Sequence, residues 1–353
     1  MKALCKQTWQ PGMALVDVPV PEPAAGAVRL RVVGSAICGS DLHIYESAPG
    51  YEWLSLPVTP GHEVAGVVDA VGPGVNPAWI GRRAVVNPYI PCGDCRQCRA
   101  GRPNLCDGGR ATLEKVPSQA LQIGFRRPGG MAEYVTAPVE NLLPLAESIP
   151  DDVAAMLESF AVSAHATERV PLREDDVALV IGPGPIGLGV VAALKARGVH
   201  RILVSGLAQD AGRMRIAKAL GASRVFDAGE AGYADVMEEE TGGAGVDVVF
   251  DCSGHPKALA DAVFSVRRGG AVVLVGIYGR PAELPANAVV RGEVSVVGTY
   301  GTTPEAFRWA VEQVEQGIVD LRPMITHVVQ LEQADAGFHH ALSKEGCKVV
   351  LKP

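Results

Sequence analysis

Four of the chain's eight cysteines fall within the stretch PCGDCRQCRAGRPNLC, residues 91–106. Two, two and seven residues separate them. Thiolates two residues apart can converge on one ion from a tight turn, and a loop can return the fourth. The spacing therefore predicts a tetrahedral zinc site held by Cys92, Cys95, Cys98 and Cys106. Because protein ligands fill every position of such a site, it is structural and closed to substrate.

An iron–sulfur cluster and a pair of disulfides are the alternatives for these four cysteines. Cluster ligands use similar spacing but usually stand in a ferredoxin-like context, which this sequence does not show. Closely spaced CxxC pairs in a chain that we expect to be cytosolic argue against disulfides. The chemistry is therefore expected elsewhere.

A second set of metal-binding residue types lies upstream. Cys38 stands in ICGSDLH, and His62 and Glu63 stand in PGHEVAGVVDAVGPGV. Taken singly, each has an ordinary structural role. Together, a thiolate, an imidazole and a carboxylate leave a fourth position open, which is typical of a catalytic zinc that polarises an oxygen. Glycines at both ends of the strand-like stretch 64–71 indicate that the backbone turns tightly beside His62.

The second of these stretches resembles a family signature, G-H-E-x2-G-x5-G-x2-V. This is the signature of the zinc-containing alcohol dehydrogenases in the medium-chain dehydrogenase/reductase superfamily. It is matched at Gly61, His62, Glu63, Gly66, Gly72 and Val75. The four-cysteine stretch resembles the structural-zinc lobe of the same superfamily, and the resemblance covers the whole chain in the expected order.

The resemblance implies roles for individual residues. Cys38, His62 and Glu63 would bind the catalytic zinc, and Glu63 is the third ligand in the polyol-dehydrogenase branch. Glu158 matches a glutamate that can approach or replace a ligand there. That branch usually has Glu-Pro at this point, whereas this chain has Ser159, which loosens the local backbone.

Ser40 and His43 match a hydroxyl and an imidazole that carry the substrate's proton to solvent. The chemistry agrees, because an alcohol must lose a proton before it loses a hydride. A serine hydroxyl can pass that proton on, and a histidine that titrates near neutral pH can deliver it to water. The alternative for Ser40 is a turn residue after Gly39.

A cofactor site is predicted further along the chain. The apolar stretch Val177–Ile181 ends in a glycine-rich loop, and a helix-length apolar stretch then runs to Gly198. A G-x-G-x-x-G loop between a strand and a helix presents the helix N-terminus to a pyrophosphate. The residues expected to contact the cofactor there are Gly182, Gly184, Pro185, Ile186 and Gly187.

The next predicted strand, Arg201–Ser205, lacks the acidic residue that normally follows it in an NAD site. Ser205 is followed by Gly206 and Leu207, and we expect Asp210 to cap the next helix. Without that acid nothing repels a 2′-phosphate, and Arg213 or Arg215 can supply a positive partner. The sequence predicts that NADP is accepted and leaves open whether it is preferred to NAD.

Alternating strands and helices predict a parallel, doubly wound sheet of the Rossmann type. Strands are expected within 246–254 and 271–276, with a helix over 256–267 between them. The ends of these strands place Ser253, Gly276 and Ile277 at the carboxyl edge of the sheet, where a cofactor binds. Cys252 is expected to be buried and structural, as are Cys5 and Cys347.

The fold class expected is therefore α/β, with a GroES-like, β-rich catalytic domain and a Rossmann coenzyme domain. Residues 1–154 would form the catalytic domain, with the structural-zinc lobe at about 88–110. Residues 155–290 would form the coenzyme domain, and the resemblance implies that 291–353 return to the first domain and leave a cleft between the two. Val294–Val297 could extend the sheet across a dimer, and a homo-oligomer, dimer or tetramer, is expected.

The bulk composition limits the partners. The 353 residues are 48% hydrophobic and 20% charged, with a formal net charge of −7. That charge argues against nucleic acid and anionic membranes, and the sequence has neither a membrane-length apolar run nor a signal core. We expect a cytoplasmic enzyme with a small-molecule substrate.

The function predicted is zinc-dependent hydride transfer between a secondary alcohol and NAD(P), with two zinc ions per chain. The Glu63 and Glu158 matches favour a polyol or cyclitol as substrate. L-Threonine is the rival, a simple alcohol is a weaker third, and a non-catalytic, zinc-stapled nucleotide-binding protein is a remote alternative. Tyr45, Trp53, Phe160, Tyr278 and Tyr300 could line the pocket, or each could be core.

Overall fold

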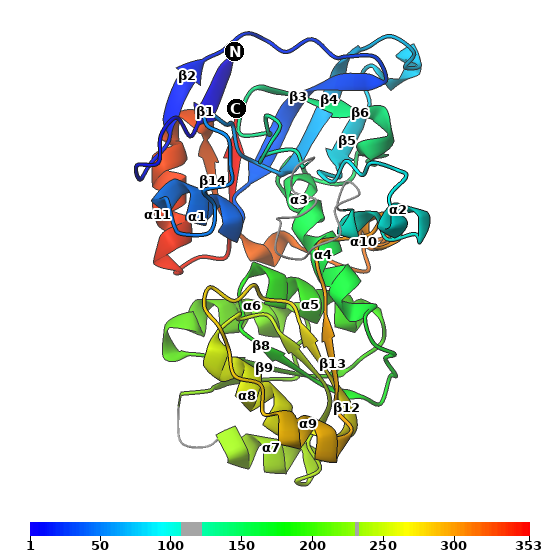
Figure 1. Cartoon of the computed structure of the whole chain (residues 1–353), viewed down its shortest axis with the longest axis vertical. Helices are drawn as coiled ribbons and strands as arrows, with labels where there is room; N and C mark the ends of the chain where they lie inside the picture. The colour runs from blue at the N-terminus through cyan, green and yellow to red at the C-terminus, as the bar shows by residue number, and fades with distance from the viewer. Residues whose placement is uncertain (107–121, 230–232) are drawn as a thin grey trace. The chain divides into compact units, whose positions relative to one another are not determined.

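The computed structural model describes residues 1–106, 122–229 and 233–353 and divides the chain into two compact units (Figure 1). Unit 1 comprises Met1–Ser159, Thr303–Val311 and Ile325–Pro353. Unit 2 comprises Phe160–Thr302 and Glu312–Met324. None of the helices in the described ranges is long and apolar enough to cross a membrane.

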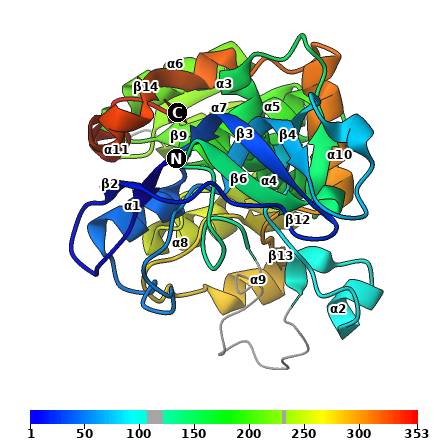
Figure 2. The same cartoon turned by 90° about the horizontal axis from the view of Figure 1, so that it is seen from above.

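Unit 1 is built on a seven-stranded sheet. Its strand order is β14-β15-β3-β4-β5-β7, with β6 paired to β3, and β1 and β2 form a separate two-stranded sheet. In Figure 2, β3, β4 and β6 lie side by side. The strands are β1 (Lys2–Cys5), β2 (Ala14–Asp17), β3 (Ala27–Ala36), β4 (Glu63–Val71), β5 (Arg83–Val86), β6 (Tyr134–Pro138), β7 (Leu142–Pro144), β14 (Ile325–Gln330) and β15 (Lys348–Lys352).

Apolar side chains at alternate positions of β3 and β4 build the core of this sheet. Val28, Leu30 and Val32 are buried with Val64 and Val68, as period-two alternation in a half-buried strand requires. The helices of unit 1 are α1 (Gly39–Glu46), α2 (Arg96–Arg99), α3 (Asp151–Ala155), α10 (Pro304–Glu315) and α11 (Ala334–Ser343); α10 runs past the boundary of the unit at Val311.

Unit 2 is a six-stranded, all-parallel sheet in the order β10-β9-β8-β11-β12-β13. Its strands are β8 (Val177–Ile181), β9 (Arg201–Gly206), β10 (Arg224–Asp227), β11 (Val246–Asp251), β12 (Val266–Leu274) and β13 (Ser295–Gly298). Its helices are α5 (Pro185–Ala196), α6 (Ala211–Leu220), α7 (Tyr233–Thr241), α8 (Pro256–Ser265) and α9 (Ala286–Gly292), and α4 (Leu157–Thr167) contains the boundary between the units.

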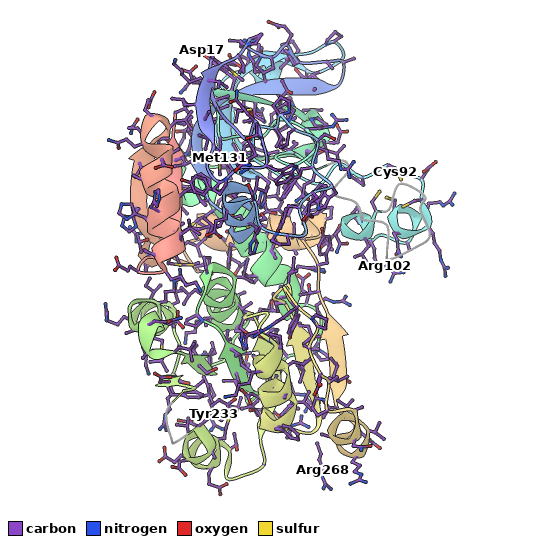
Figure 3. The ribbon with its side chains drawn as sticks, turned by 60° about the vertical axis from the view of Figure 1, so that its left-hand side comes forward. Asp17, Cys92, Arg102, Met131, Tyr233 and Arg268 are labelled. Atoms are coloured by element: carbon purple, nitrogen blue, oxygen red, sulfur yellow. The ribbon has the colours of Figure 1, made fainter. Side chains whose placement is uncertain are left out.

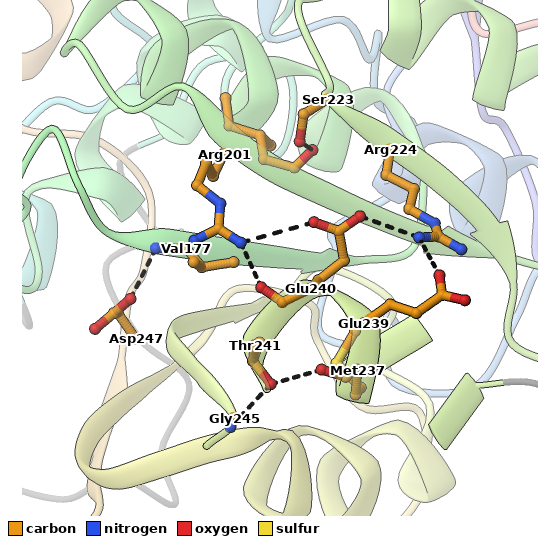
Figure 4. A network of polar contacts seen from close by, with 11 residues as sticks. Val177, Arg201, Ser223, Arg224, Met237, Glu239, Glu240, Thr241, Gly245 and Asp247 are labelled. Atoms are coloured by element: carbon orange, nitrogen blue, oxygen red, sulfur yellow. Dashed lines mark hydrogen bonds and ion pairs between the residues drawn. The ribbon is translucent and has the colours of Figure 1, made fainter. Parts of the chain in front are cut away.

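Helices cover both faces of the unit 2 sheet (Figure 1). α7, α8 and α9 contribute to one buried cluster with alternate residues of β8 and with Val246 and Val249 of β11, and α5 and α6 pack on the other face. Arg224 of β10 pairs with Glu239 (2.7 Å) and Glu240 (3.1 Å) of α7 at the edge of the sheet (Figure 4). The mixed fold, with a β-rich unit and a parallel doubly wound sheet, confirms the predicted fold class.

The division of the chain differs in detail from the expected one. Residues 291–302 and 312–324, which the sequence assigns to the C-terminal segment, cluster with unit 2. The cause for the first segment is β13, which pairs in parallel with β12. β14, α11 and β15 belong to unit 1, where β15 pairs antiparallel with β3.

Candidate active site

The four cysteines proposed as structural ligands lie together. The Sγ atoms of Cys92, Cys95, Cys98 and Cys106 are all within 4.8 Å of one another. Cys98 Sγ lies 3.5 Å from Cys95 Sγ and 4.0 Å from Cys92 Sγ. Tetrahedral Zn–S bonds of about 2.3 Å would place sulfurs about 3.8 Å apart, whereas a disulfide holds them at about 2.05 Å. The donor set and its spacing fit a metal site and exclude paired disulfides.

Short local elements bring these thiols together. Cys95 is the N-cap of α2, and its sulfur accepts a hydrogen bond from the N–H of Cys98 (3.5 Å). The N–H of Cys92 donates to the sulfur of Cys106 (3.3 Å). Figure 3 shows Cys92 and Arg102 on this lobe, away from the sheet of unit 1. Residues 107–110 of the predicted lobe lie outside the described residues.

The second set also converges, and it is more deeply enclosed. One ligand atom each of Cys38, His62 and Glu63 lies within 4.8 Å of the others. Cys38 is the N-cap of α1, and Glu63 begins β4. The antiparallel register pairs Ala36 with Glu63, so the chain that leaves β3 carries Cys38 to the start of β4.

Glu63 is held by a cation from the far end of the chain. Its Oε1 accepts a hydrogen bond from Nζ of Lys348 on β15 (2.5 Å), and both side chains are buried. Its Oε2 has no hydrogen-bond partner among the described residues. A buried carboxylate oxygen without a partner carries a desolvation cost. A metal ion next to it would remove that cost.

His62 has a carboxylate behind it. Its Nδ1 lies 3.9 Å from Oδ1 of Asp41, which is fully buried. Within the described residues neither atom has a hydrogen-bond partner. The other oxygen of Asp41 accepts the N–H of Cys38 (2.9 Å). A histidine that binds a metal through one nitrogen usually donates the other N–H to such a carboxylate.

Burial controls the ionisation of this set. Desolvation, followed by the charge of Glu63, raises the pKa of the Cys38 thiol to about 12. Desolvation raises the pKa of Glu158 to about 8, against the opposing effect of His62. A thiol with such a pKa becomes a thiolate at neutral pH only beside a cation. The buried thiol, imidazole and carboxylate therefore fit a divalent metal, whose charge would stabilise their deprotonated forms.

Glu158 is not one of the three converging ligands. It lies in the first turn of α4 and is 3% exposed. Ser159, which replaces the proline of the family pattern, donates its hydroxyl to the carbonyl of Met156 (3.0 Å). The serine therefore makes a hydrogen bond at the turn before Glu158 that a proline could not make.

The residues proposed as a proton relay lie on α1. Ser40 and His43 are three residues apart, so they project from neighbouring positions of the helix. The Ser40 hydroxyl is buried and unpartnered among the described residues, whereas the His43 ring is exposed and stacks on Tyr51 at 5.6 Å. One group lies inside the protein and the other meets solvent.

In unit 2, glycines let three loops meet at the carboxyl edge of the sheet. A Cβ on Gly187 would lie 2.0 Å from the carbonyl oxygen of Gly182, and one on Gly182 would lie 3.1 Å from Ser253. A Cβ on Gly276 would lie 2.3 Å from the nitrogen of Gly254. Gly184 is the N-cap of α5 and Pro185 follows it, so the start of this helix carries no capping side chain. The predicted phosphate loop therefore has the bare helix N-terminus that a pyrophosphate requires.

Asp251, at the end of β11, organises the neighbouring loops. Its Oδ1 accepts hydrogen bonds from the N–H (2.9 Å) and the hydroxyl (2.7 Å) of Ser253. Its Oδ2 accepts the hydroxyl of Tyr278 (2.5 Å). Tyr278 also lines a cavity of about 520 Å³ with Leu274 and Arg280. Ile277, a predicted cofactor contact, is 79% exposed at this edge.

The loop after β9 has a packing feature that the sequence does not reveal. A Cβ on Gly206 would lie 2.9 Å from Cγ of Pro183 and 3.3 Å from Cβ of Asp210. The sequence predicts that the side chain of Asp210 caps α6, and this prediction is wrong. Oδ2 of Asp210 instead accepts the N–H of Leu207 (3.0 Å). Ser205 is buried, and Arg213 lies in the first turn of α6.

The aromatic pocket candidates and the three other cysteines have different surroundings. Tyr45 and Phe160 are core residues, 8% and 1% exposed, whereas Trp53 and Tyr300 are half-buried.

Cys5 and Cys347 are buried as expected. Cys252 is half-buried rather than buried, and burial followed by Asp251 raises its pKa well above the usual value.

Sequence reasoning missed three charged residues of these sites. Asp41 stands three residues after Cys38, a spacing that allows the capping box seen at α1, so a local signal existed. Asp251 ends a strand at the edge where cofactors bind, which is a weaker signal. Lys348 is 285 residues from Glu63, and no local pattern marks it.

Comparison with known proteins shows the family of this chain. Residues 24–147 match the alcohol dehydrogenase GroES-like domain, and residues 185–316 match the zinc-binding dehydrogenase family. An L-threonine 3-dehydrogenase of Rhizobium etli (strain CIAT 652) is 32% identical over 352 residues, which cover 99% of this chain and 98% of the relative.

Solved structures resemble the chain over its whole length. An alcohol dehydrogenase of Escherichia coli CFT073 in complex with NADH has a TM-score of 0.89 at 29% identity, covering 100% of this chain and 99% of that one. A 2R,3R-butanediol dehydrogenase of Bacillus subtilis has a TM-score of 0.88 at 30% identity, with the same coverage.

The fold and the comparisons define a zinc-dependent alcohol-type dehydrogenase. The chain belongs to the zinc-dependent medium-chain dehydrogenases and is similar to their polyol and threonine dehydrogenase members. It is an oxidoreductase that acts on alcohols with Zn²⁺ and NAD(P).

Proposed function

We propose that Cys38, His62 and Glu63 hold the catalytic zinc, with Glu158 beside them, and that Ser40 and His43 move the substrate's proton. The observation that carries this proposal is the unpartnered Oε2 of Glu63 next to a buried thiol and imidazole. Donors of these three types leave a position open for substrate. The second zinc would be held by Cys92, Cys95, Cys98 and Cys106.

The chain's own residues then have distinct tasks. When bound, zinc acts as a Lewis acid on the substrate oxygen and NAD(P) accepts the hydride. Lys348 holds Glu63 through one oxygen, and Asp41 orients the ring of His62. The buried Ser40 hydroxyl would accept the proton of the substrate hydroxyl while donating its own proton onward to His43, and the exposed His43 would release that proton to water.

The substrate proposed is a secondary alcohol on a polyhydroxylated chain or ring. Glu63 and Glu158 support this substrate class, because both match acidic residues of the polyol-dehydrogenase branch. L-Threonine is the second candidate, because a relative at 32% identity over 99% of this chain is an L-threonine 3-dehydrogenase. Initial rates of reduced-cofactor formation on polyols, cyclitols, L-threonine and short alcohols test the choice. A rate on L-threonine alone would replace the polyol assignment.

The cofactor preference proposed is acceptance of NADP together with NAD. Gly206 occupies the position where an NAD site carries an acid. Its packing against Pro183 makes Gly206→Asp a poor test, because the added Cβ would collide at 2.9 Å. Leu207 is 47% exposed, so Leu207→Asp can add the charge without that collision.

Kinetics of the Leu207 variants with both cofactors test this preference. Leu207→Asp is expected to lower kcat/KM for NADP relative to NAD by roughly 10-fold, since a carboxylate repels the 2′-phosphate. Leu207→Asn controls for shape. If the ratio of kcat/KM for NADP to kcat/KM for NAD is the same in both variants and in the wild type, the loop does not discriminate between the two cofactors.

Two further properties are proposed. Four thiols that are paired in no disulfide favour the reducing cytoplasm as the site of action. β13 is the last strand at one edge of the unit 2 sheet, with Val296 and Val297 on it, which favours a homo-oligomer that extends the sheet. A predicted interface of this kind is tested by light scattering of the purified protein.

A further inference from the structure

A row of aromatic rings leads away from the proposed catalytic ligands in unit 1. The ring of Phe125 lies 5.0 Å from that of His62. Trp53 stacks on Phe125 at 6.0 Å and on Tyr51 at 6.3 Å. Tyr51 in turn stacks on His43 at 5.6 Å. The row therefore joins a zinc ligand and the outer relay residue, and Trp53 is its midpoint.

Trp53 is held in place on this row. Its Nε1 donates a hydrogen bond to the carbonyl of Gly50 (3.0 Å). One side of it packs on a buried cluster formed by Ile44, Leu54 and Phe125. Its own side chain is half-buried, so part of the indole remains open to a ligand. A fixed aromatic surface of this kind provides apolar contact at low entropic cost.

Arg126 places a positive charge on that surface. Its guanidinium lies over the Trp53 ring, 5.2 Å from the centroid. Arg126 is exposed, and no Asp or Glu in the described part of the chain forms an ion pair with it. By contrast, Arg29 and Arg83 of the same unit are paired with Asp69 and Asp151. The charge of Arg126 is positioned by the indole and is not neutralised by a described carboxylate.

We propose that Arg126, seated on Trp53, is a specificity-determining residue that binds an anionic group of the alcohol substrate. The substrate would then be a hydroxy compound that carries a phosphate or a carboxylate some way along its carbon chain from the reacting hydroxyl. The inference rests on the proposed function, because it takes Cys38, His62 and Glu63 as the place where the hydroxyl binds.

The chemistry of the group supports this choice. A guanidinium offers planar, paired donors that match carboxylate and phosphate oxygens. Stacking on an indole fixes its plane, so less side-chain entropy is lost when an anion binds. Arg126 directly follows Phe125, whose ring contacts His62, so one short segment contributes to both ends of the substrate site. The rings between them suit the carbon skeleton.

A matched set of three substrates tests the proposal on the zinc-loaded enzyme. Galactitol, galactitol 1-phosphate and galactonate share a polyhydroxylated chain and differ in the terminal group. The wild type is expected to have a higher kcat/KM for one or both anionic compounds than for galactitol. The phosphate and carboxylate arms then identify which oxyanion is used.

Variants of Arg126 give the decisive comparison. Arg126→Met is expected to lower the ratio of kcat/KM for the preferred anion over galactitol by about 10- to 100-fold, the usual effect of losing a charged hydrogen bond. The loss should fall on KM more than on kcat, and Arg126→Lys should restore part of it. Arg127→Met, one residue along and also exposed, is the control and should leave the ratio unchanged.

Two results would overturn the proposal: a wild type with no preference for either anion, or an unchanged ratio in Arg126→Met. Direct binding separates this failure from failure of the proposed function. Calorimetry with galactitol 1-phosphate and galactonate should show binding to the wild type that is weakened in Arg126→Met, whether or not turnover occurs. Binding without any turnover would overturn the catalytic assignment and leave Arg126 as the anion site. Turnover of 2,3-butanediol without binding of either anion would support the catalytic assignment and overturn the anion site at Arg126.

Discussion

The two proposed metal sites of unit 1 use similar donors in different surroundings. Cys92 and Cys98 of the four-cysteine cluster are exposed or half-exposed, and its sulfurs accept hydrogen bonds from backbone N–H groups of the same short stretch. His62 and Glu63 of the other cluster are buried, with Lys348 and Asp41 bonded to or facing them.

We interpret this difference as the one between a proposed structural zinc site and a proposed catalytic zinc site. Local N–H donors and four equivalent ligands leave nothing for a substrate to bind, so a metal there can only hold the lobe. Three unlike donors among buried charges would leave one coordination position open to substrate, and burying these groups lowers the stability of the folded protein. Among the described residues, Glu63 Oε2, His62 Nδ1 and the Ser40 hydroxyl have no hydrogen-bond partner, which supports the proposal that the chemistry takes place at the second cluster.

The largest expected effect tests this division directly. Cys38→Ser should lower turnover more than 1,000-fold, roughly the loss that removal of a core catalytic group causes, and should leave a folded protein whose unfolding midpoint falls less than that of Cys98→Ser. Cys98→Ser should retain a measurable rate per folded molecule. It should lose one zinc and about 3 kcal/mol of stability, the linkage expected for a ligand at about 100 times its Kd.

Metal analysis, urea denaturation and initial rates on the two variants provide the measurement. The wild type should contain two zinc ions per chain, and each variant should retain one. Equal loss of folding in Cys38→Ser and Cys98→Ser would mean that both clusters are structural.

Removing the cation behind Glu63 should produce the next largest effect. Lys348 and Glu63 are 1% and 0% exposed. Breaking a buried pair by removing one partner typically costs about 3–5 kcal/mol, because the remaining charge is uncompensated. Lys348→Met should therefore destabilise the protein by about that amount in urea denaturation.

A double variant sharpens the result. Lys348→Met with Glu63→Gln removes both charges and should recover most of the stability without recovering activity. Lys2→Met is the control, since Lys2 forms an exposed pair with Asp17 and should change stability little. If the double variant is no more stable than Lys348→Met, the lost energy is packing and not charge.

These contrasts also show what sequence alone can reveal. The convergence of the four cysteines can be predicted from the sequence because they lie close together in the chain, so their local spacing determines it. The Cys38, His62 and Glu63 set was predicted from residue types and a family resemblance, and the β3–β4 register explains its convergence. The phosphate loop was predicted because a strand, a glycine-rich turn and a helix are consecutive.

The features that the sequence does not predict depend on contacts between distant segments of the chain. Lys348 reaches Glu63 only because β15 pairs with β3. The packing of Gly206 against Pro183 is set by how two loops meet. The row from His62 through Phe125 to Trp53 combines three separate segments. β13 lies in the segment that the sequence assigns to the C-terminal return, and its parallel pairing with β12 is another contact between separate segments of the chain.

The relay gives a smaller expected effect with a pH signature. His43→Gln should lower kcat/KM by about 100-fold near neutral pH, as loss of a positioned proton carrier does. The deficit should shrink as the pH rises, because hydroxide then removes the proton without help. Rates from pH 6 to 10 measure this, and His339→Gln, an exposed histidine on α11, is the control. A deficit that does not vary with pH would assign His43 a structural role.

The smallest effect concerns the carboxylate behind His62, and it should appear in one cluster only. Asp41→Asn keeps an oxygen for the N–H of Cys38 but removes the charge 3.9 Å from Nδ1 of His62. Loss of such a partner typically weakens metal affinity by about 10- to 100-fold, and we expect about 10-fold, since the wild-type contact is long. Competition with a colorimetric zinc chelator should show two zinc populations in the wild type. Only one should shift in Asp41→Asn, and the population that Cys98→Ser removes should be unchanged. A shift of both would mean that Asp41 supports unit 1 as a whole, whereas a shift of neither would leave the orientation of His62 to the packing of Phe125.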